Sequence, residues 1–291
     1  LHAVDDVSIQ FCRGQTLGVV GESGCGKSTL GRTILKLLEP TEGEILFEGR
    51  DIAKYGKKDT INMRKEIQMI FQDPYASLDP RMTVSEIIAE PLYIHNIHAN
   101  RAEVDQHVKK LMDTVGLASR LTNAYPHELD GGRRQRIGIA RALSVDPEFI
   151  ICDEPISALD VSIQAQVINM LKELQEERGL TYLFIAHDLS VVKYISDRVV
   201  VMYLGTMVET AETDELYTHP MHPYTQALLS AIPEADPNKA KANQRIPIKG
   251  EIPSPINPKN CCRFAERCQH ATERCFKEMP QMKEIAPGHK V

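Results

Sequence analysis

Gly21-Glu22-Ser23-Gly24-Cys25-Gly26-Lys27-Ser28 is the stretch that decides the fold, because it fits the pattern G-x-x-x-x-G-K-[ST]. It follows an apolar run at residues 16–20 and opens a helical pattern over residues 27–38. This strand–loop–helix order is the context in which the pattern forms a phosphate-binding loop. Glycines let the backbone approach closely, so that backbone N–H groups and the helix N-terminus bind phosphate oxygens. A glycine-rich turn with a chance lysine is the alternative.

This loop supplies the first set of candidate binding residues. Lys27 is expected to reach the β- and γ-phosphates of a nucleotide, and the Ser28 hydroxyl is expected to bind Mg²⁺. The nucleotide contacts expected in this stretch are Gly21, Glu22, Ser23, Gly24, Cys25, Gly26, Lys27, Ser28 and Thr29.

Short apolar runs alternate with helical patterns along the chain, which favours an α/β fold. Strands are expected at residues 16–20, 67–71, 149–152, 181–186 and 198–203. These runs suggest strands that are buried on both faces, as in a parallel sheet.

Two acids end one of these strands. Asp153 and Glu154 directly follow the apolar run at residues 149–152. Asp153 is placed to hold Mg²⁺ through water, and Glu154 is placed to act as general base for an attacking water. Many buried strands end in Asp or Glu, so the pair becomes informative only beside the phosphate-binding loop.

The chain divides into three expected parts. Residues 1–83 and 145–215 form the ATP-binding core. Residues 84–144 are helical and more polar, with a capping-box pattern at Asn100 and Glu103, and read as a helical subdomain inserted into the core. Prolines accumulate after residue 216, so residues 216–291 are expected to form an extended, irregular C-terminal extension.

Composition narrows the class of protein. The net charge of −6 over 291 residues argues against a broad nucleic-acid-binding surface, and we expect no nucleic-acid partner. No run of 18 apolar residues is present, so no membrane span is expected, and the cytoplasm is the default location. Because the first residue is Leu1, we expect the sequence to be trimmed at its start.

Four of the seven cysteines lie close together near the C-terminus. Cys261, Cys262, Cys268 and Cys275 fall within fifteen residues, and an odd total does not fit a secreted disulfide framework. Their spacing differs from the short C-x-x-C of common zinc sites. Three or four thiolates can hold a [4Fe–4S] cluster or zinc, and free thiols are the other alternative.

Several motifs together resemble those of ABC ATPases. Leu129-Asp130-Gly131-Gly132-Arg133 resembles the signature motif, and Ser157-Ala158-Leu159-Asp160 resembles the D-loop. Gln72 then corresponds to the Q-loop and His187 to the switch histidine, although each alone reads as a structural polar residue at a strand end. The resemblance spans roughly residues 15–205 and implies an ATPase core with a mixed sheet and a helical subdomain.

The resemblance assigns roles to these residues. Glu154, His187 and Gln72 are the expected catalytic set, and Gln72 would join Ser28 and Asp153 as a ligand of Mg²⁺. The remaining expected ATP contacts are Asp130, Gly131, Gly132 and Asp160.

Three further stretches resemble the second ATPase subunit of oligopeptide/dipeptide importers: residues 75–82, 222–229 and 250–255. This implies ATP-driven peptide uptake. Nickel importers share much of the pattern and are the alternative cargo class. A soluble ABC ATPase of DNA repair or translation fits less well, because those chains usually carry two cassettes or a coiled-coil insertion. A P-loop kinase or GTPase is disfavoured by the signature motif.

The resemblance also implies partners. A sister ATPase subunit would form a head-to-tail dimer in which each ATP lies between one P-loop and the other signature motif. The Gln72 region and the helical subdomain would contact two membrane-spanning subunits at the cytoplasmic face of the membrane, and an extracellular binding protein would deliver the cargo. Members of this group carry a further cysteine that completes a [4Fe–4S] set with residues matching Cys262, Cys268 and Cys275.

The sequence departs from the family at the signature motif. Asp130 and Arg133 replace the Ser and Gln that most members carry. Two like charges about 4 Å apart repel by roughly 4 kcal/mol at an effective dielectric near 20, so Asp130 would disfavour the γ-phosphate of the partner's ATP. Arg133 or Arg134 could offset this. Weak ATPase activity of the isolated chain is therefore expected. The resemblance also implies an aromatic residue that stacks on adenine upstream of the phosphate-binding loop, and the residues before Phe11 offer no clear candidate for it.

Overall fold

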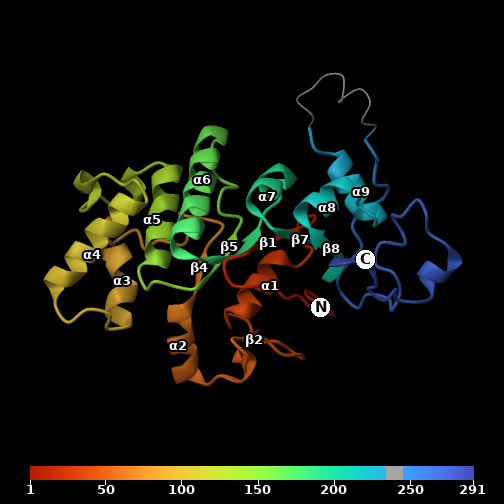
Figure 1. Cartoon of the computed structure of the whole chain (residues 1–291), viewed down its shortest axis with the longest axis horizontal. Coiled ribbons are helices and arrows are strands. Elements are labelled where there is room, and N and C mark those ends of the chain that lie inside the picture. Colours follow the sequence, from red (N-terminus) through yellow and green to blue (C-terminus); the bar gives the residue numbers. More distant parts are fainter. Residues whose placement is uncertain (234–244) are drawn as a thin grey trace. The chain divides into compact units, whose positions relative to one another are not determined.

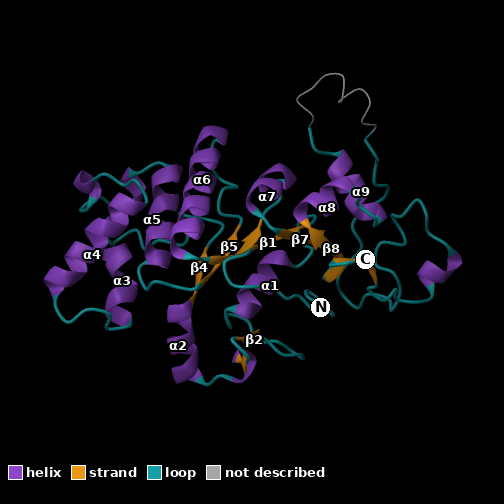
Figure 2. Ribbon diagram, in the orientation of Figure 1, coloured by secondary structure: helices purple, strands orange, loops and turns teal. Residues whose placement is uncertain are grey.

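Strands and helices alternate along most of the chain in the computed structural model, which describes residues 1–233 and 245–291 (Figures 1 and 2). The described residues fall into two units. Unit 1 comprises Leu1–Phe11, Thr16–Leu30 and Ala186–Val291, and unit 2 comprises Cys12–Gln15 and Gly31–Ile185. The α/β fold expected from the sequence is confirmed.

Unit 2 contains three parallel strands. β5 (Phe149–Asp153) pairs on one side with β4 (Ile67–Ile70) and on the other with β6 (Thr181–Ile185). All residues of β5 and β6 are buried, which explains why their sequences are mostly apolar, with Asp153 at the end of β5 and Thr181 at the start of β6 as exceptions. The long helix α6 (Val161–Arg178) ends at Gly179, whose φ of +66° gives the left-handed turn that often closes a helix.

The expected helical insertion lies within unit 2 and consists mainly of α3 (Val84–Ile94), α4 (Arg101–Thr114) and α5 (Gly131–Leu143). α3 packs against both α4 and α5. Each helix begins at a side-chain cap: Thr83 with Glu86 for α3, Asn100 with Glu103 for α4, and Asp130 for α5. The smaller elements of unit 2 are β2 (Leu46–Phe47), β3 (Arg50–Asp51) and α2 (Lys57–Glu66).

Unit 1 carries mixed strand pairing. β1 (Thr16–Val20) runs parallel to β7 (Arg198–Tyr203), which pairs antiparallel with β8 (Thr206–Glu212). Two short C-terminal strands extend this sheet: β10 (His289–Lys290) pairs antiparallel with β8, and β9 (Glu284–Ala286) pairs antiparallel with β10. Its helices are α7 (Leu189–Ile195), α8 (Thr213–Thr218) and α9 (Pro223–Ser230), together with the first turn of α1 (Lys27–Ile34).

Two local expectations were wrong. The helix expected over residues 27–38 ends at Ile34, because Lys36 has a φ of +52° and the N–H of Leu37 bonds back to the carbonyl of Arg32. The C-terminal extension is not irregular throughout: Pro223 opens α9 as its first residue, where its missing N–H costs nothing, and the chain returns after the cysteines to form β9 and β10. Residues 234–244 of the extension lie outside the described residues.

Candidate functional site

The phosphate-binding loop connects β1 to α1 in unit 1, as the sequence predicts. The side chain of Lys27 is buried, and its Nζ donates hydrogen bonds to the carbonyl oxygens of Gly21 (2.8 Å) and Glu22 (3.0 Å). Gly26 has a φ of +105°, and a Cβ placed there would lie 2.1 Å from the carbonyl oxygen of Ala3. Only glycine therefore fits position 26. The two carbonyl groups hold the Lys27 amine within the loop that is expected to bind phosphate.

The two acids expected in catalysis end β5 in unit 2. Asp153 is fully buried, and one nitrogen of the Arg32 guanidinium lies 3.9 Å from its carboxylate. Glu154 is 5% exposed and has a φ of +48°, in the left-handed region that a non-glycine residue occupies at a cost of roughly 1–2 kcal/mol. Its N–H bonds to the carbonyl of Ile185 at 2.9 Å, which helps to hold this turn. Backbone strain of this kind clusters at functional sites.

Gln72, which follows β4, is brought directly against Glu154. Its Nε2 donates a hydrogen bond of 2.6 Å to a carboxylate oxygen of Glu154. The structure thus joins two residues of the expected catalytic set that lie far apart in the sequence.

The signature stretch opens α5 in unit 2. Asp130 is the N-cap residue, and its Oδ1 accepts the N–H of Arg133 at 2.8 Å. Its Oδ2 lies 3.4 Å from the Arg133 guanidinium, so both carboxylate oxygens face groups of the same residue. Gly131 and Gly132 form the first turn of the helix, and Asp160 is the N-cap residue of α6.

The remaining candidates divide between the two units. Ser28 and Thr29 lie in the first turn of α1, and His187, which is exposed, lies just before Asp188, the N-cap residue of α7. These three belong to unit 1, whereas Gln72, Asp153 and Glu154 belong to unit 2.

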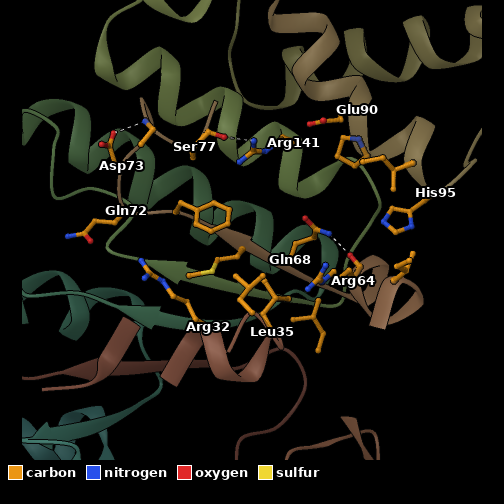
Figure 3. Close-up of a pocket in the computed structure, with 18 residues that line it drawn as sticks. Arg32, Leu35, Arg64, Gln68, Gln72, Asp73, Ser77, Glu90, His95 and Arg141 are labelled. Carbon is orange, nitrogen blue, oxygen red and sulfur yellow. Dashed lines mark hydrogen bonds between the residues drawn. The ribbon is translucent and has the colours of Figure 1, made fainter. Parts of the chain in front are cut away.

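A pocket of about 670 Å³ lies within unit 2 beside Gln72 (Figure 3). Apolar side chains of α2, β4, α3 and the segment after α1 line it, together with five charged ones. The charged residues are Arg32, Arg64, Asp73, Glu90 and Arg141. Arg141 donates a 2.6 Å hydrogen bond to the carbonyl of Ser77, and burial lowers the pKa of its guanidinium. The sequence carries no direct signal for this pocket, because its walls come from separate segments.

The cysteine loop gives no support for the expected metal centre. The described residues contain no group of three or more His, Cys, Asp or Glu side chains arranged to hold a metal ion. The sulfurs of Cys268 and Cys275 accept backbone N–H groups of His270 (3.3 Å) and Thr272 (3.5 Å). Burial raises the pKa of Cys262, whereas hydrogen bonds from Thr272 lower the pKa of Cys275.

Two neighbours of the phosphate-binding loop were not among the candidate site residues taken from the sequence. The hydroxyl of Tyr224 accepts the backbone N–H of Glu22, and Arg267 donates two hydrogen bonds to the Glu22 carboxylate. Tyr224 lies in a stretch that resembles the peptide importers, whereas only its place beside Cys268 draws attention to Arg267.

No helix in residues 1–233 or 245–291 has the length and apolar character needed to cross a membrane.

Solved ATP-binding cassettes resemble the chain in three dimensions. A dimeric post-hydrolysis structure of the cassette MJ0796, bound to ADP and Pi, has a TM-score of 0.67 and 29% identity, and the match covers 72% of this chain and 90% of that one. CbiO1 from Clostridium perfringens, part of the ABC transporter complex cbiONQ, has a TM-score of 0.68 and 28% identity over 75% and 84%.

Curated relatives are more similar in sequence. The oligopeptide transport ATP-binding proteins AppF of Bacillus subtilis and OppF of Haemophilus influenzae are 57% and 58% identical to this chain. The matches cover 99% of the chain and 88% of AppF, and 96% of the chain and 84% of OppF.

Two family profiles match separate parts of the chain. The ABC transporter profile matches residues 4–157, and the profile of the oligopeptide/dipeptide transporter C-terminal region matches residues 208–275. Together with the relatives and the phosphate-binding loop, these matches show that the chain belongs to the ABC transporter family.

Proposed function

We propose that the chain is the ATP-hydrolysing subunit of an importer that takes up oligopeptides or dipeptides. The observation that carries this proposal is the direct contact between the phosphate-binding loop and the peptide-transporter C-terminal region, made by Tyr224 and Arg267 on Glu22. The names of the relatives support the cargo class. A nickel importer of the same group is the second candidate.

The residues of each unit have distinct tasks in the proposed reaction. In unit 1 the backbone of residues 21–27 binds the phosphates, and Lys27 exchanges its carbonyl partners for phosphate oxygens. In unit 2 Glu154 takes the proton of the attacking water, and Gln72 holds the carboxylate that does so. His187 is the remaining catalytic candidate.

The Mg²⁺ ligands that the family implies are the Ser28 hydroxyl in unit 1 and, in unit 2, the Asp153 carboxylate and Gln72, each of which offers the oxygen ligand that this ion prefers. The ion would neutralise charge on the β- and γ-phosphates. The Asp153 carboxylate is buried, and a buried negative charge needs a compensating positive charge. A bound Mg²⁺ ion would supply it.

The partners are proposed from the family. A sister ATPase subunit would place its P-loop against Asp130, Gly131 and Gly132, with Asp160 at the same interface. The pocket beside Gln72 would receive a segment of a membrane-spanning subunit, because its apolar lining includes the 61% exposed side chain of Ile94. A segment bound in this pocket would contact Gln72, whose side chain donates a hydrogen bond to Glu154. The chain would then work at the cytoplasmic face of the membrane, with a substrate-binding protein outside.

An iron–sulfur cluster or zinc at Cys262, Cys268 and Cys275 stays a prediction. Metal analysis of protein purified without oxygen tests it, with about four irons per chain expected for a [4Fe–4S] cluster and loss of iron on Cys268→Ser. Zinc in place of iron would identify a zinc site, and the absence of both would leave three free thiols.

Uptake in cells tests the function. A strain that lacks the gene is given the wild-type gene or the Glu154→Gln variant, and the uptake of labelled oligopeptides, dipeptides and nickel is measured in parallel. Peptide uptake restored by the wild type alone supports the proposal. Restored nickel uptake without peptide uptake favours the second candidate, and no change in either excludes both cargoes.

A further inference from the structure

Arg267 of the C-terminal extension forms a two-pronged ion pair with Glu22 of the phosphate-binding loop. Its two terminal nitrogens donate to the two Glu22 carboxylate oxygens at 2.6 and 3.1 Å. The Arg267 side chain is 7% exposed, and one of the same nitrogens also lies 3.3 Å from the hydroxyl of Tyr203. Paired guanidinium–carboxylate bonds of this kind fix direction as well as charge, so Glu22 is held in one orientation.

A buried aromatic cluster fixes the same loop residue through its backbone. The Tyr224 hydroxyl accepts the Glu22 N–H at 2.8 Å. The Tyr224 ring packs against Tyr203 and Phe264, with ring centroids 4.8 and 5.4 Å apart, and Tyr203 lies 5.1 Å from Phe264. Because Phe264 lies in the same segment as Arg267, that segment of the extension contacts Glu22 directly through Arg267 and indirectly through this cluster.

The ion pair bears on nucleotide binding because of where Glu22 sits. Its carbonyl oxygen accepts a hydrogen bond from Lys27, the residue expected to bind the β- and γ-phosphates. An unpaired carboxylate in a loop that binds a polyanion repels that ligand, and it also lets the loop backbone move. Arg267 removes both effects by neutralising and anchoring Glu22.

We propose that Arg267 is a positioning residue of the ATP site, which acts through Glu22 to hold the phosphate-binding loop in its nucleotide-ready form. The inference rests on the proposed function, in which this loop binds ATP. It assigns to the peptide-transporter C-terminal region a direct part in nucleotide binding on its own subunit.

The segment that carries Arg267 is itself fastened to the cysteine loop. Cys268 follows Arg267 directly, and the N–H of Cys262 lies within hydrogen-bonding distance of the carbonyls of Cys275 (3.0 Å) and Glu278 (3.2 Å). The anchor for the ATP site is therefore the folded cysteine loop rather than a free tail.

The chain offers a matched control four residues away. The Arg263 side chain is 5% exposed, pairs with Asp5 and donates a 2.8 Å hydrogen bond to the carbonyl of Leu204. It thus belongs to the same segment and forms a similar buried ion pair, but its partner lies outside the phosphate-binding loop. Any general effect of losing a buried arginine from this segment will appear in an Arg263 variant.

The experiment compares Arg267→Met, Arg263→Met, Arg267→Lys and the double variant Glu22→Gln/Arg267→Met in the full-length protein. Binding of a fluorescent ADP with Mg²⁺ and the thermal unfolding midpoint are measured for each. We expect Arg267→Met to weaken ADP binding by about tenfold, or roughly 1.4 kcal/mol, and Arg263→Met to leave it unchanged. Arg267→Lys, which keeps the charge but not the paired geometry, should fall between, and the double variant should recover only the part of the affinity that the unpaired Glu22 charge costs, because the anchor is still missing.

In the assembled transporter the Arg267→Met variant should raise the KM for ATP and leave kcat unchanged, because the lost contact acts equally on bound ATP and on the transition state. If Arg267→Met is unstable, Arg267→Lys and the double variant still decide the question. Equal ADP affinity in the Arg267 and Arg263 variants overturns this inference alone. A wild-type protein that binds no nucleotide overturns the proposed function and this inference with it.

Discussion

The side-chain amide of Gln72 donates a 2.6 Å hydrogen bond to the carboxylate of Glu154, although 82 positions separate the two residues. Glu154 combines this bond with a buried position and a left-handed backbone, so its carboxylate is held from both the side chain and the main chain. A group held in this way can keep its place while ATP and water arrive, which is what a general base requires.

Glu154→Gln should therefore separate binding from hydrolysis. Glutamine has the same shape and can still accept a hydrogen bond from Gln72, but it cannot take a proton from water. Hydrolysis should fall by about 10²–10⁴-fold while the affinity for ATP stays unchanged. Fluorescent nucleotide binding and phosphate release, measured in a transporter whose sister site is also disabled, check the two parts.

Lys27→Ala complements the Glu154→Gln variant, because it removes a side chain that is expected to bind phosphate and leaves the general base in place. It should weaken nucleotide binding itself. Full turnover in the Glu154→Gln protein would contradict the role given to Glu154, and unchanged binding in the Lys27→Ala protein would contradict the role given to Lys27.

We expect a charged substitution in the pocket beside Gln72 to weaken assembly with the membrane-spanning subunits without destabilising the fold. Ile94 lines this pocket and is 61% exposed, so Ile94→Asp should leave the unfolding midpoint unchanged. A charge on an apolar contact surface should weaken assembly with the membrane-spanning subunits by at least about tenfold, the effect of roughly 1.4 kcal/mol. Co-purification of the subunits at graded concentrations measures this.

Leu46→Asp provides the control for that prediction. Leu46 is 59% exposed in the same unit and does not line the pocket. Equal assembly of the two variants would mean that the pocket is not the docking site.

His222 predicts a loss of stability at mildly acid pH. Burial lowers its pKa to about 4, and its Nδ1 accepts the N–H of Tyr224 at the start of α9, which only the unprotonated nitrogen can do. Since the folded pKa lies below the unfolded value of about 6.5, its contribution is complete above pH 6.5 and declines as the pH falls toward 4. The loss should amount to up to about 3 kcal/mol below pH 4, and it would be larger without the Glu209 carboxylate, which raises this pKa.

Chemical denaturation between pH 7.5 and pH 5 measures this dependence. His222→Asn keeps a capping side chain that does not titrate, so its stability should depend less on pH than that of the wild type. His270→Asn, a change at an exposed histidine of the same unit, should keep the wild-type slope. A wild-type slope in the His222 variant would contradict the assignment.

The sequence predicts some features better than others for physical reasons. The strands near Val19, Ile151 and Phe184 were predictable because burial on both faces requires continuous apolar runs. The cap at Asn100 was predictable because it depends on residues three positions apart. β10 was not, because two residues carry no periodic pattern and pair with β8 only in the folded chain.

The same distinction applies to the candidate site. Lys27 and Glu154 belong to local patterns whose chemistry can be read from neighbouring residues. The pairing of Arg267 with Glu22 joins positions 245 apart, and no local pattern predicts which acid a buried arginine will meet. The pairing of Gln72 with Glu154 has the same origin, although the family resemblance had already singled out both residues.

Asp130 and Arg133 lead to the last prediction, because they form a pair within the first turn of α5. The carboxylate caps the helix through the N–H of Arg133 and lies 3.4 Å from its guanidinium. The repulsion expected between Asp130 and the partner's γ-phosphate is therefore offset while Arg133 is present. Asp130→Ser should change the unfolding midpoint little, since serine caps almost as well, and should change the rate of hydrolysis only modestly.

Arg133→Gln should have the larger effect, because it leaves the Asp130 carboxylate without a positively charged partner at the proposed γ-phosphate site. Hydrolysis in the dimer with the sister subunit should fall about tenfold if 1.4 kcal/mol of repulsion acts in the transition state. The double variant Asp130→Ser/Arg133→Gln, which removes both charges, should recover the wild-type rate or exceed it. Steady-state rates of the four proteins under identical Mg²⁺ and ATP give the coupling between the two residues directly. A tenfold rise on Asp130→Ser alone would show that the carboxylate repels the phosphate despite Arg133, and additive effects would show that the two residues act independently.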